Sequence, residues 1–226
     1  MLTKGSSLTM KTVLRTLMFA VLMVAISGLA QAGDTSVLHP PKGSKVAIIV
    51  FEDLECPQCA RVEPTLDAAA REYKIPLVRY DFPLPMHQWS YQAHVTARYF
   101  DTKSKELGEE FRRWIFTNQR FITKQNVGGM IDRFATEKHV SVPAPVDPTG
   151  ELAAKVNADK AIGEKVGIDH TPTVYVVGDS RQTPYIEVKE PQSQLFATID
   201  QMKATVQAEA PAPKAKSAAR AGKPVQ

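Results

Sequence analysis

The residues best suited to chemistry are the only two cysteines of the 226-residue chain, Cys56 and Cys59. They follow an apolar, β-branched run at 45–53 and open a helical pattern that begins at Pro57. Residues three apart on the first turn of a helix face the same side, so these two thiols can close a small disulfide. The helix N-terminus also stabilises a thiolate at Cys56 through its partial positive charge and unpaired N–H groups. A Cys-x-x-Cys placed between a strand and a helix is typical of a redox-active dithiol.

The two thiols are predicted to have different roles. Cys56 is expected to be the exposed nucleophile, whereas Cys59 lies one turn deeper as the resolving thiol, and exchange passes through a mixed disulfide. Three alternatives stay open. An inert disulfide would stabilise weakly because its loop is short. The pair could be half of a zinc site, but the chain has no second cysteine pair and no suitably spaced histidines to complete it. The thiolates could also carry Cu(I), but no Met or His stands close to the pair in sequence to support this.

Three acidic residues, Glu52, Asp53 and Glu55, flank the cysteines. Like charges raise the pKa of a thiol, whereas a helix N-terminus lowers it. Exposed carboxylates are screened beyond about 8–10 Å at physiological salt, so we expect Glu55 to contribute modestly. The sequence therefore predicts a Cys56 pKa between about 3.5 and about 8.5, the values of a strongly activated and a free cysteine.

The elements around the motif predict a strand–helix–strand unit. The run at 45–53 predicts a strand buried on both faces, and Pro57 suits the start of the helix because its missing N–H costs nothing there. Pro64 lies inside this helix and should kink it. The segment IPLVRYDFPLP predicts a second strand that ends at Pro83 and Pro85. Such a unit requires a parallel strand pair with a crossover helix.

Downstream the pattern becomes helical from His87 onward, and His87 should open the first of these helices as a cap. Asp147 should cap the last one, with Pro148 in its first turn. Two strands within 171–189 should form an antiparallel pair, and a helix from about 191 closes the domain. The order β-α-β, helical block, β-β-α predicts an α/β fold with a helical insertion.

The two ends of the chain differ from its middle. Residues 1–32 combine a basic start, the apolar run LMFAVLMVAISGLA and an Ala-x-Ala site, which together indicate a secretory signal cleaved after Ala32. The alternative is an uncleaved membrane anchor. Residues 207–226 are rich in Ala, Pro and Lys and are predicted to be a disordered basic tail. The net charge of +4 comes from the ends, because 33–202 carries −3, so composition gives no argument for nucleic-acid binding.

Together these features resemble the thioredoxin superfamily, and more narrowly its exported DsbA-like branch. CPQC follows a buried strand, Asp53 stands three residues before Cys56, and Pro64 stands eight residues after it. DFPLPMHQWSYQAHVTARYF is similar to the strand end and first inserted helix of that branch, and VGIDHTPTVYVVG resembles its cis-proline segment. The likeness covers about residues 45–202. It implies a lead-in loop at 33–44, a thioredoxin-fold domain at 45–86 and 168–206, and a helical insertion at 87–167.

The resemblance also implies a site and a function. Thr171–Pro172 would carry a cis bond packed against the disulfide, leaving the Thr171 backbone unpaired for a client strand beside Cys56. The implied function is a thiol:disulfide oxidoreductase, periplasmic or otherwise exported, that donates its disulfide to substrate proteins. A reductase or isomerase of the same fold, and a non-catalytic binder or chaperone, are the alternatives. A membrane redox partner would reoxidise the protein, no cofactor or metal is implied, and the short segment 33–44 favours a monomer.

Four residues near the motif are predicted to tune its redox chemistry. The family often has a buried carboxylate six residues before the first cysteine, where this chain has Val50. In the family, that carboxylate transfers protons to and from the inner thiol. Glu52 should share a strand face with Val50, so either Glu52 replaces the carboxylate or this chain lacks the proton relay. Gln58 stands where the strongest oxidants have histidine and so supplies no positive charge. His170 either lies near the disulfide or faces solvent. The fourth is Pro57, between the cysteines.

Overall fold

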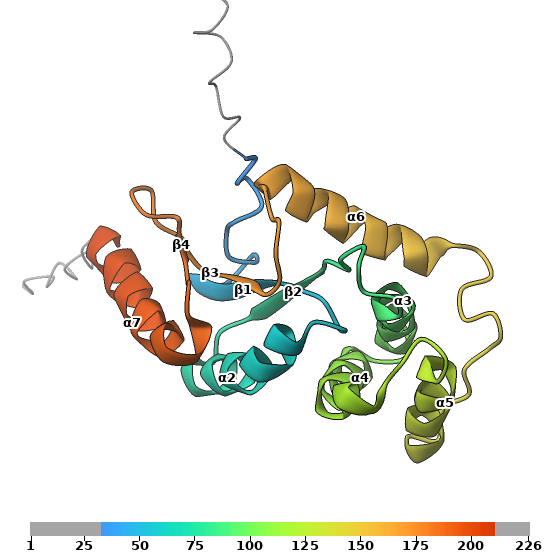
Figure 1. Ribbon diagram of the computed structural model, residues 1–226. Helices are drawn as coiled ribbons and strands as arrows, with labels where there is room; N and C mark the ends of the chain where they lie inside the picture. The colour runs from blue at the N-terminus through green and yellow to red at the C-terminus, as the bar shows by residue number, and fades with distance from the viewer. Residues whose placement is uncertain (1–32, 211–226) are drawn as a thin grey trace, which may run out of the picture. The chain divides into compact units, whose positions relative to one another are not determined.

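A four-stranded mixed sheet in the order β2-β1-β3-β4 is central to the described residues (Figure 1). The computed structural model describes residues 33–210, so the predicted signal at 1–32 and the tail beyond 210 lie outside the described residues. The strands are β1 (Val46–Glu52), β2 (Leu77–Asp81), β3 (Thr173–Gly178) and β4 (Tyr185–Glu187). β1 pairs in parallel with β2 and antiparallel with β3, and β3 pairs antiparallel with β4. Both predicted strand pairs are therefore confirmed.

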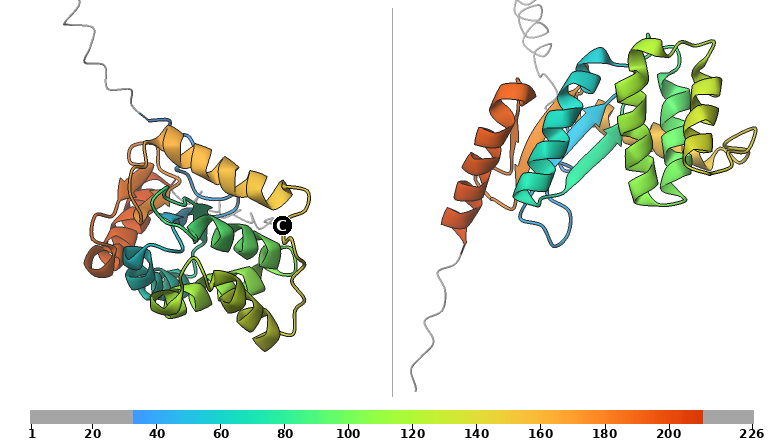
Figure 2. Two further views of the ribbon diagram at one scale, coloured as in Figure 1. Left: turned by 45° about the vertical axis from the view of Figure 1, so that its right-hand side comes forward. Right: turned by 90° about the horizontal axis from the view of Figure 1, so that it is seen from below.

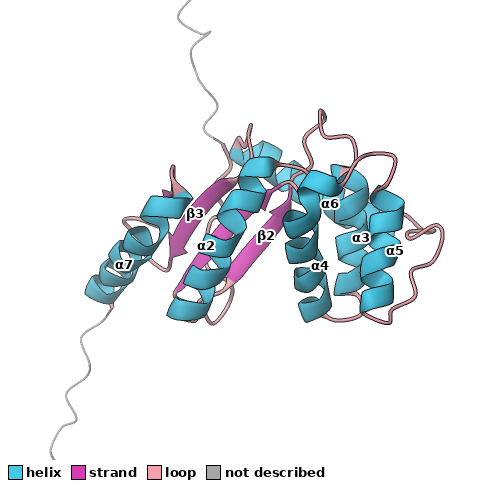
Figure 3. Cartoon of the chain, turned by 60° about the horizontal axis from the view of Figure 1, so that its bottom comes forward, coloured by secondary structure: helices cyan, strands magenta, loops and turns pink. Residues whose placement is uncertain are grey.

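Helices cover both faces of the sheet (Figures 1 and 3). On one face lie α2 (Pro57–Tyr73) and α7 (Pro191–Glu209), and on the other lies α6 (Glu151–Val166). Side chains of β1 alternate between the faces because successive residues of a strand point to opposite sides. Its apolar residues divide between an α2/α7 core, with Val46, Ile48 and Val50, and an α6 core, with Ala47, Ile49 and Phe51. The strand is buried on both faces, as its sequence predicts.

The other helices form a layer beside the sheet (Figure 2). They are α3 (Ser90–Asp101), α4 (Lys105–Asn118), the 3-10 turn η1 (Gln119–Phe121) and α5 (Val127–Glu137). Phe100, Phe111 and Phe134 pack at the centre of this layer, with ring centroids 4.8, 5.0 and 5.1 Å apart. Their apolar cluster also contains Cys56 and Cys59. The cysteines therefore lie where the sheet domain meets the inserted helices.

Helix α6 ends the inserted block by returning to the sheet. Gly163 allows its close approach, because a Cβ atom there would lie 2.6 Å from the ring of Phe82 and 3.1 Å from the ring of Phe51. Real Cβ contacts are not this short, so the helix can reach the end of the sheet only where it has no side chain.

The first inserted helix begins later than predicted. α3 starts at Ser90, and His87 lies in the preceding loop, so the prediction that His87 caps this helix is wrong. The reason lies far away in sequence, because the carboxylate of Glu55 accepts hydrogen bonds from the N–H groups of Trp89 and Ser90 at 2.7 and 3.0 Å. A carboxylate from the Cys-x-x-Cys segment thus supplies the N-terminal cap of α3.

Three other boundaries also differ from the predictions. α6 begins at Glu151, so Pro148 lies outside it, although the Asp147 carboxylate accepts hydrogen bonds from two N–H groups of its first turn, as predicted. β2 ends at Asp81, before the prolines that were expected to end it. α7 continues to Glu209, which is three residues into the segment predicted to be a disordered tail.

The described core is built entirely from residues between Val37 and Val206. A chain that starts at Gly33, the residue after the predicted cleavage site, therefore contains every residue of this core. Of the helices within 33–210, none combines the length and the apolar character that crossing a membrane requires.

Candidate active site

The two cysteines lie at the N-terminal end of α2. Cys56 directly precedes the helix in an extended conformation, with φ −76° and ψ 120°, and its N–H donates to the carbonyl of Asp53 at 3.0 Å. Pro57 occupies the first helical position, where its fixed φ suits the helix and its missing N–H is not needed. Cys59 lies within the first turn, and both cysteines are free thiols. The sequence placed this motif correctly because all its determinants are local.

Both thiols are nearly buried. The exposed fraction is 5% for Cys56 and 3% for Cys59, so the prediction of an exposed Cys56 is wrong. The physical reason is that the inserted helices pack against the motif and include both cysteines in their apolar cluster. Burial removes solvent from a thiolate, so polar contacts within the protein must supply its stabilisation.

The segment that leads into β3 lies directly against Cys56. In its protonated form, the Cys56 thiol donates a hydrogen bond to the carbonyl of Thr171 over 3.3 Å, although the two residues are 115 positions apart. The Thr171–Pro172 peptide bond is cis. The resemblance implied an unpaired Thr171 backbone, but its carbonyl is engaged by Cys56 in this structure. Ionisation of Cys56 removes this donor, so a client strand that pairs here would compete with the contact only while Cys56 is protonated.

The structure shifts the pKa values of the two thiols in opposite directions. A hydrogen bond from the Cys59 thiol is the largest cause that lowers the pKa of Cys56 to about 5. Burial opposes it, and the Thr171 side chain and then the N–H groups of Cys59 and Gln58 add to it. Burial, followed by the contact with Cys56, raises the pKa of Cys59 well above its ordinary value. At neutral pH, Cys56 is therefore a thiolate and Cys59 a thiol. The value for Cys56 lies inside the range predicted from the sequence.

Glu52 is a buried carboxylate at the end of β1, and it belongs to a buried ion cluster. Arg79 binds Glu52 over 2.6 Å and Glu63 over 2.8 Å, and all three side chains are almost completely covered. Burial raises the pKa of Glu52 to about 7, although the charge of Arg79 opposes the rise. The charge of Glu52 in turn raises the pKa of Cys59. Glu52 can therefore hold or release a proton near neutral pH while its charge acts on the inner thiol.

The other two acids accept hydrogen bonds from residues 87–90, at the start of the insertion. Asp53 is fully buried; its carboxylate accepts hydrogen bonds from Ser90 Oγ at 2.5 Å and His87 Nδ1 at 2.7 Å. Glu55 caps α3, as described above. The sequence analysis expected all three acids to raise the pKa of Cys56 as like charges, with a modest contribution from Glu55. None of the three acids is among the main causes of the Cys56 pKa.

Two side chains of the insertion, which the sequence reasoning missed, hold the turn before Cys56. The N–H of Leu54 donates to Nε2 of His94 at 3.2 Å, and Nδ1 of His94 donates to the buried carboxylate of Asp81 at 2.8 Å. From η1, the Gln119 amide donates to the carbonyls of Leu54 and Cys56 at 2.9 and 3.1 Å. The only sequence signal was a histidine within the apolar stripe of a helix, which does not reveal a partner 40 residues away.

Two predicted tuning residues, Gln58 and His170, have polar partners away from the sulfurs. The side-chain Oε1 of Gln58 accepts a hydrogen bond from Nε of Arg61 at 3.0 Å. His170 has a side chain 64% exposed and contacts Asp169 at 2.6 Å, so the solvent-facing alternative holds for it. Both residues line an open surface pocket together with Thr171 and Pro172, which places that pocket beside the motif. Within residues 33–210, no group of three or more His, Cys, Asp or Glu side chains is arranged to hold a metal ion.

Comparisons with known proteins agree with this geometry. The family profile described as Thioredoxin matches residues 41–208. No curated protein sequence matches the chain. Among solved structures, α-DsbA1 of Wolbachia pipientis is similar with a TM-score of 0.62 at 14% identity, over 75% of this chain and 92% of that one.

Two further structures have comparable similarity. A thioredoxin-like oxidoreductase of Silicibacter pomeroyi has a TM-score of 0.58 at 22% identity, over 76% of this chain and 99% of that chain. A periplasmic thioredoxin-like protein of Salmonella enterica serovar Typhimurium has a TM-score of 0.54 at 20% identity, over 73% and 88% of the two chains. At such identities the likeness concerns the fold, and the profile match shows the family. The chain therefore belongs to the thioredoxin superfamily, and its fold is the DsbA-like form with helices inserted between the β-α-β and β-β-α halves.

Proposed function

We propose that the protein is an exported thiol:disulfide oxidoreductase that donates its Cys56–Cys59 disulfide to the thiols of substrate proteins. The observation that carries this proposal is the pKa of Cys56, which the structure lowers to about 5 at a helix N-terminus beside the Pro172 segment. An inert, bracing disulfide has no need of a stabilised thiolate, so this feature favours chemistry at the pair.

The lowered pKa also favours the donor direction. At pH 7, a Cys56 pKa of about 5 in place of 9.0 stabilises the reduced form by about 2.7 kcal/mol. For a two-electron couple, about 30 mV corresponds to 1.4 kcal/mol, so this stabilisation raises the reduction potential by about 60 mV. A couple whose reduced form is stabilised gives its disulfide away more readily. We therefore favour an oxidase over a reductase or isomerase of the same fold.

The exchange balances with the residues at hand. A client thiolate attacks Sγ of Cys56, the S–S bond breaks, and Cys59 leaves as a thiolate that takes a proton from Glu52. A second client thiolate then attacks the client sulfur of the mixed disulfide and releases Cys56 as a thiolate. The client loses two electrons and gains a disulfide, and the protein ends reduced, with Cys56 as a thiolate, Cys59 as a thiol and Glu52 ionised. Glu52 thus takes the place of the carboxylate absent at Val50, and its pKa of about 7 suits proton transfer at neutral pH.

The surroundings of the site support protein clients. The pocket lined by Gln58, His170, Thr171 and Pro172 lies open beside Cys56 and offers room for an extended client segment. Export is supported by the signal pattern at 1–32, which lies outside the described residues, and by the periplasmic thioredoxin-like protein of similar fold. The proposal also includes two further features: the protein acts as a monomer, and a membrane partner reoxidises it.

The decisive measurement is the reduction potential of the Cys56–Cys59 couple against glutathione. We expect a value toward the oxidising end of the family range of about −270 to about −120 mV. A value near the thioredoxin end would assign the protein to the reductases. A Cys56→Ser variant that kept full activity in peptide oxidation and in cells would contradict any catalytic role and favour a non-catalytic binder.

A further inference from the structure

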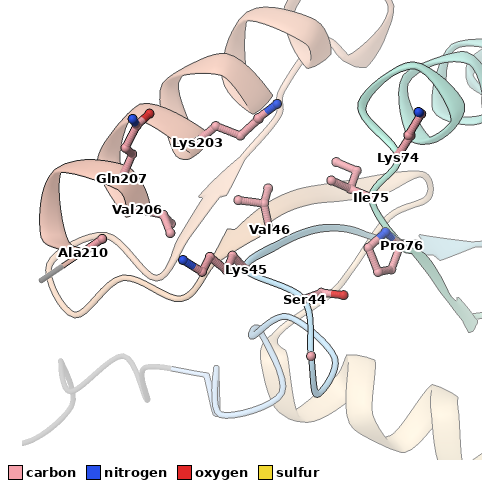
Figure 4. A pocket seen from close by; sticks show the side chains of 11 residues that line it. Ser44, Lys45, Val46, Lys74, Ile75, Pro76, Lys203, Val206, Gln207 and Ala210 are labelled. Carbon is pink, nitrogen blue, oxygen red and sulfur yellow. The ribbon is translucent and has the colours of Figure 1, made fainter. Parts of the chain in front are cut away.

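A second pocket lies at the opposite end of the sheet from the cysteines (Figure 4). It is formed by the start of β1, the turn between α2 and β2, and the last turns of α7, and it has a volume of about 420 Å3. β1 runs from Val46 at this pocket to Glu52 beneath the cysteines. At about 3.3 Å per residue, the strand separates the two ends by about 20 Å.

The pocket combines an apolar floor with a basic rim. Val46 and Val206 line it while only 5% and 7% exposed, and Lys45, Lys74 and Lys203 lie around them (Figure 4). No acidic residue lines the pocket. Among the described residues, none of the three lysines forms a salt bridge with a carboxylate within 4.0 Å; Nζ of Lys203 instead lies 4.9 Å from the ring centroid of Tyr73. Three cations without carboxylate partners around an apolar floor suit an anionic amphiphile.

The basic tail leaves the fold at this same place. Ala210 lines the pocket and directly precedes the segment 211–226, which contains four basic residues and no acidic ones. The rest of the fold does not share this charge, because 33–202 carries −3. The three lysines at the pocket therefore contrast with the negative net charge of the domain, and four basic residues follow Ala210 in the sequence.

We propose that this pocket binds the anionic surface of a phospholipid membrane. The lysines would contact lipid phosphates, and the apolar floor would receive the glycerol and upper acyl region of one lipid. A purely polar polyanion would satisfy the lysines but leave the apolar floor unused, so the lipid is the better match. Bound in this way, the protein would turn Cys56 away from the membrane, toward clients in solution. This inference does not depend on the redox function.

The test uses the chain from Gly33 to Gln226, which contains the whole described core, and vesicles of phosphatidylcholine with or without phosphatidylglycerol. We expect sedimentation with the anionic vesicles only, weakened by salt. A triple variant, Lys45→Gln, Lys74→Gln and Lys203→Gln, should bind about 100-fold more weakly, at about fivefold per lysine near an anionic surface.

A matched control removes the same charge elsewhere, as Lys124→Gln, Lys155→Gln and Lys165→Gln, and it should weaken binding less than about threefold. Equal losses in the two triple variants would overturn the proposal, since net charge alone would then explain binding. Equal binding of the wild type to neutral and anionic vesicles would also overturn it. The same holds if deletion of 211–226 abolishes vesicle binding while the pocket triple variant still binds normally. Lysine-dependent binding to polyphosphate without binding to vesicles would assign the site to a polymer instead. Disulfide exchange by the pocket variant should be unchanged, which separates this test from that of the proposed function.

Discussion

Replacing Cys59 by alanine should raise the pKa of Cys56, because it removes the hydrogen bond that lowers that pKa most. Replacing Cys59 by serine keeps a donor at the same position and so serves as the matched control. Each variant retains Cys56 as its only thiol. The titration of a single thiolate can therefore be followed without ambiguity.

The size of the effect follows from the contact. A hydrogen bond to a charged group contributes about 1.5–3 kcal/mol, and one pKa unit corresponds to about 1.4 kcal/mol. Cys59→Ala should therefore raise the Cys56 pKa by about 1–2 units, from about 5 toward about 6–7. Cys59→Ser should keep it within about one unit of the starting value. Loss of the methyl-sized thiol also leaves a small cavity, but a cavity does not by itself favour the protonated form.

The assay is the ultraviolet absorbance of the thiolate as a function of pH, checked by the rate of alkylation with iodoacetamide. If the pKa in Cys59→Ala stays at about 5, the Thr171 side chain and the backbone N–H groups at the start of α2 are sufficient, and the role assigned to the Cys59 thiol is wrong. If both variants shift equally, the serine has failed as a donor, and the contact depends on sulfur geometry.

The same pKa makes the stability of the reduced protein depend on pH. The folded pKa of Cys56, about 5, lies below its value of 9.0 without these contacts, so the thiolate stabilises the fold above pH 5. This contribution is about 2.7 kcal/mol at pH 7 and is lost as the pH falls through about 5. The difference between reduced wild type and Cys56→Ser in urea unfolding should show this dependence. A pH-independent difference would mean that the thiolate is not stabilised in the fold.

Three further substitutions test the surroundings. Glu52→Gln should slow disulfide donation below pH 7, because Glu52 has a pKa of about 7 and is protonated there. The difference between the stopped-flow rates of the variant and the wild type should disappear as the pH rises through that value. His94→Ala leaves the N–H of Leu54 without its acceptor and should cost about 2–4 kcal/mol in urea unfolding, whereas His94→Gln, which retains an acceptor, should cost less. Gly163→Ala places a Cβ against the ring of Phe82 and should destabilise by about 1–3 kcal/mol in the same assay; no loss would show that α6 can shift freely.

The sequence predicted most elements because their signals are local. The run at 45–53 is apolar throughout, the helix start is marked by Pro57, and the strand pair near the C-terminus is bounded by turn residues. The start of α3 could not be predicted, because Glu55 supplies its cap from 34 and 35 residues away. A pattern within one segment does not contain such a partner.

The candidate site divides in the same way. That two thiols lie at the tip of a helix, with a carboxylate in the preceding strand, was determined by residues 50–59 alone. The same residues predicted that Cys56 is the thiol that ionises. Whether the thiols are exposed, and what Glu52 is bound to, were decided only by packing. Thr171 reaches Cys56 across 115 residues, and Gln119 reaches Leu54 across 65. Burial and charge pairing set a pKa, and both depend on which distant segments the fold brings together.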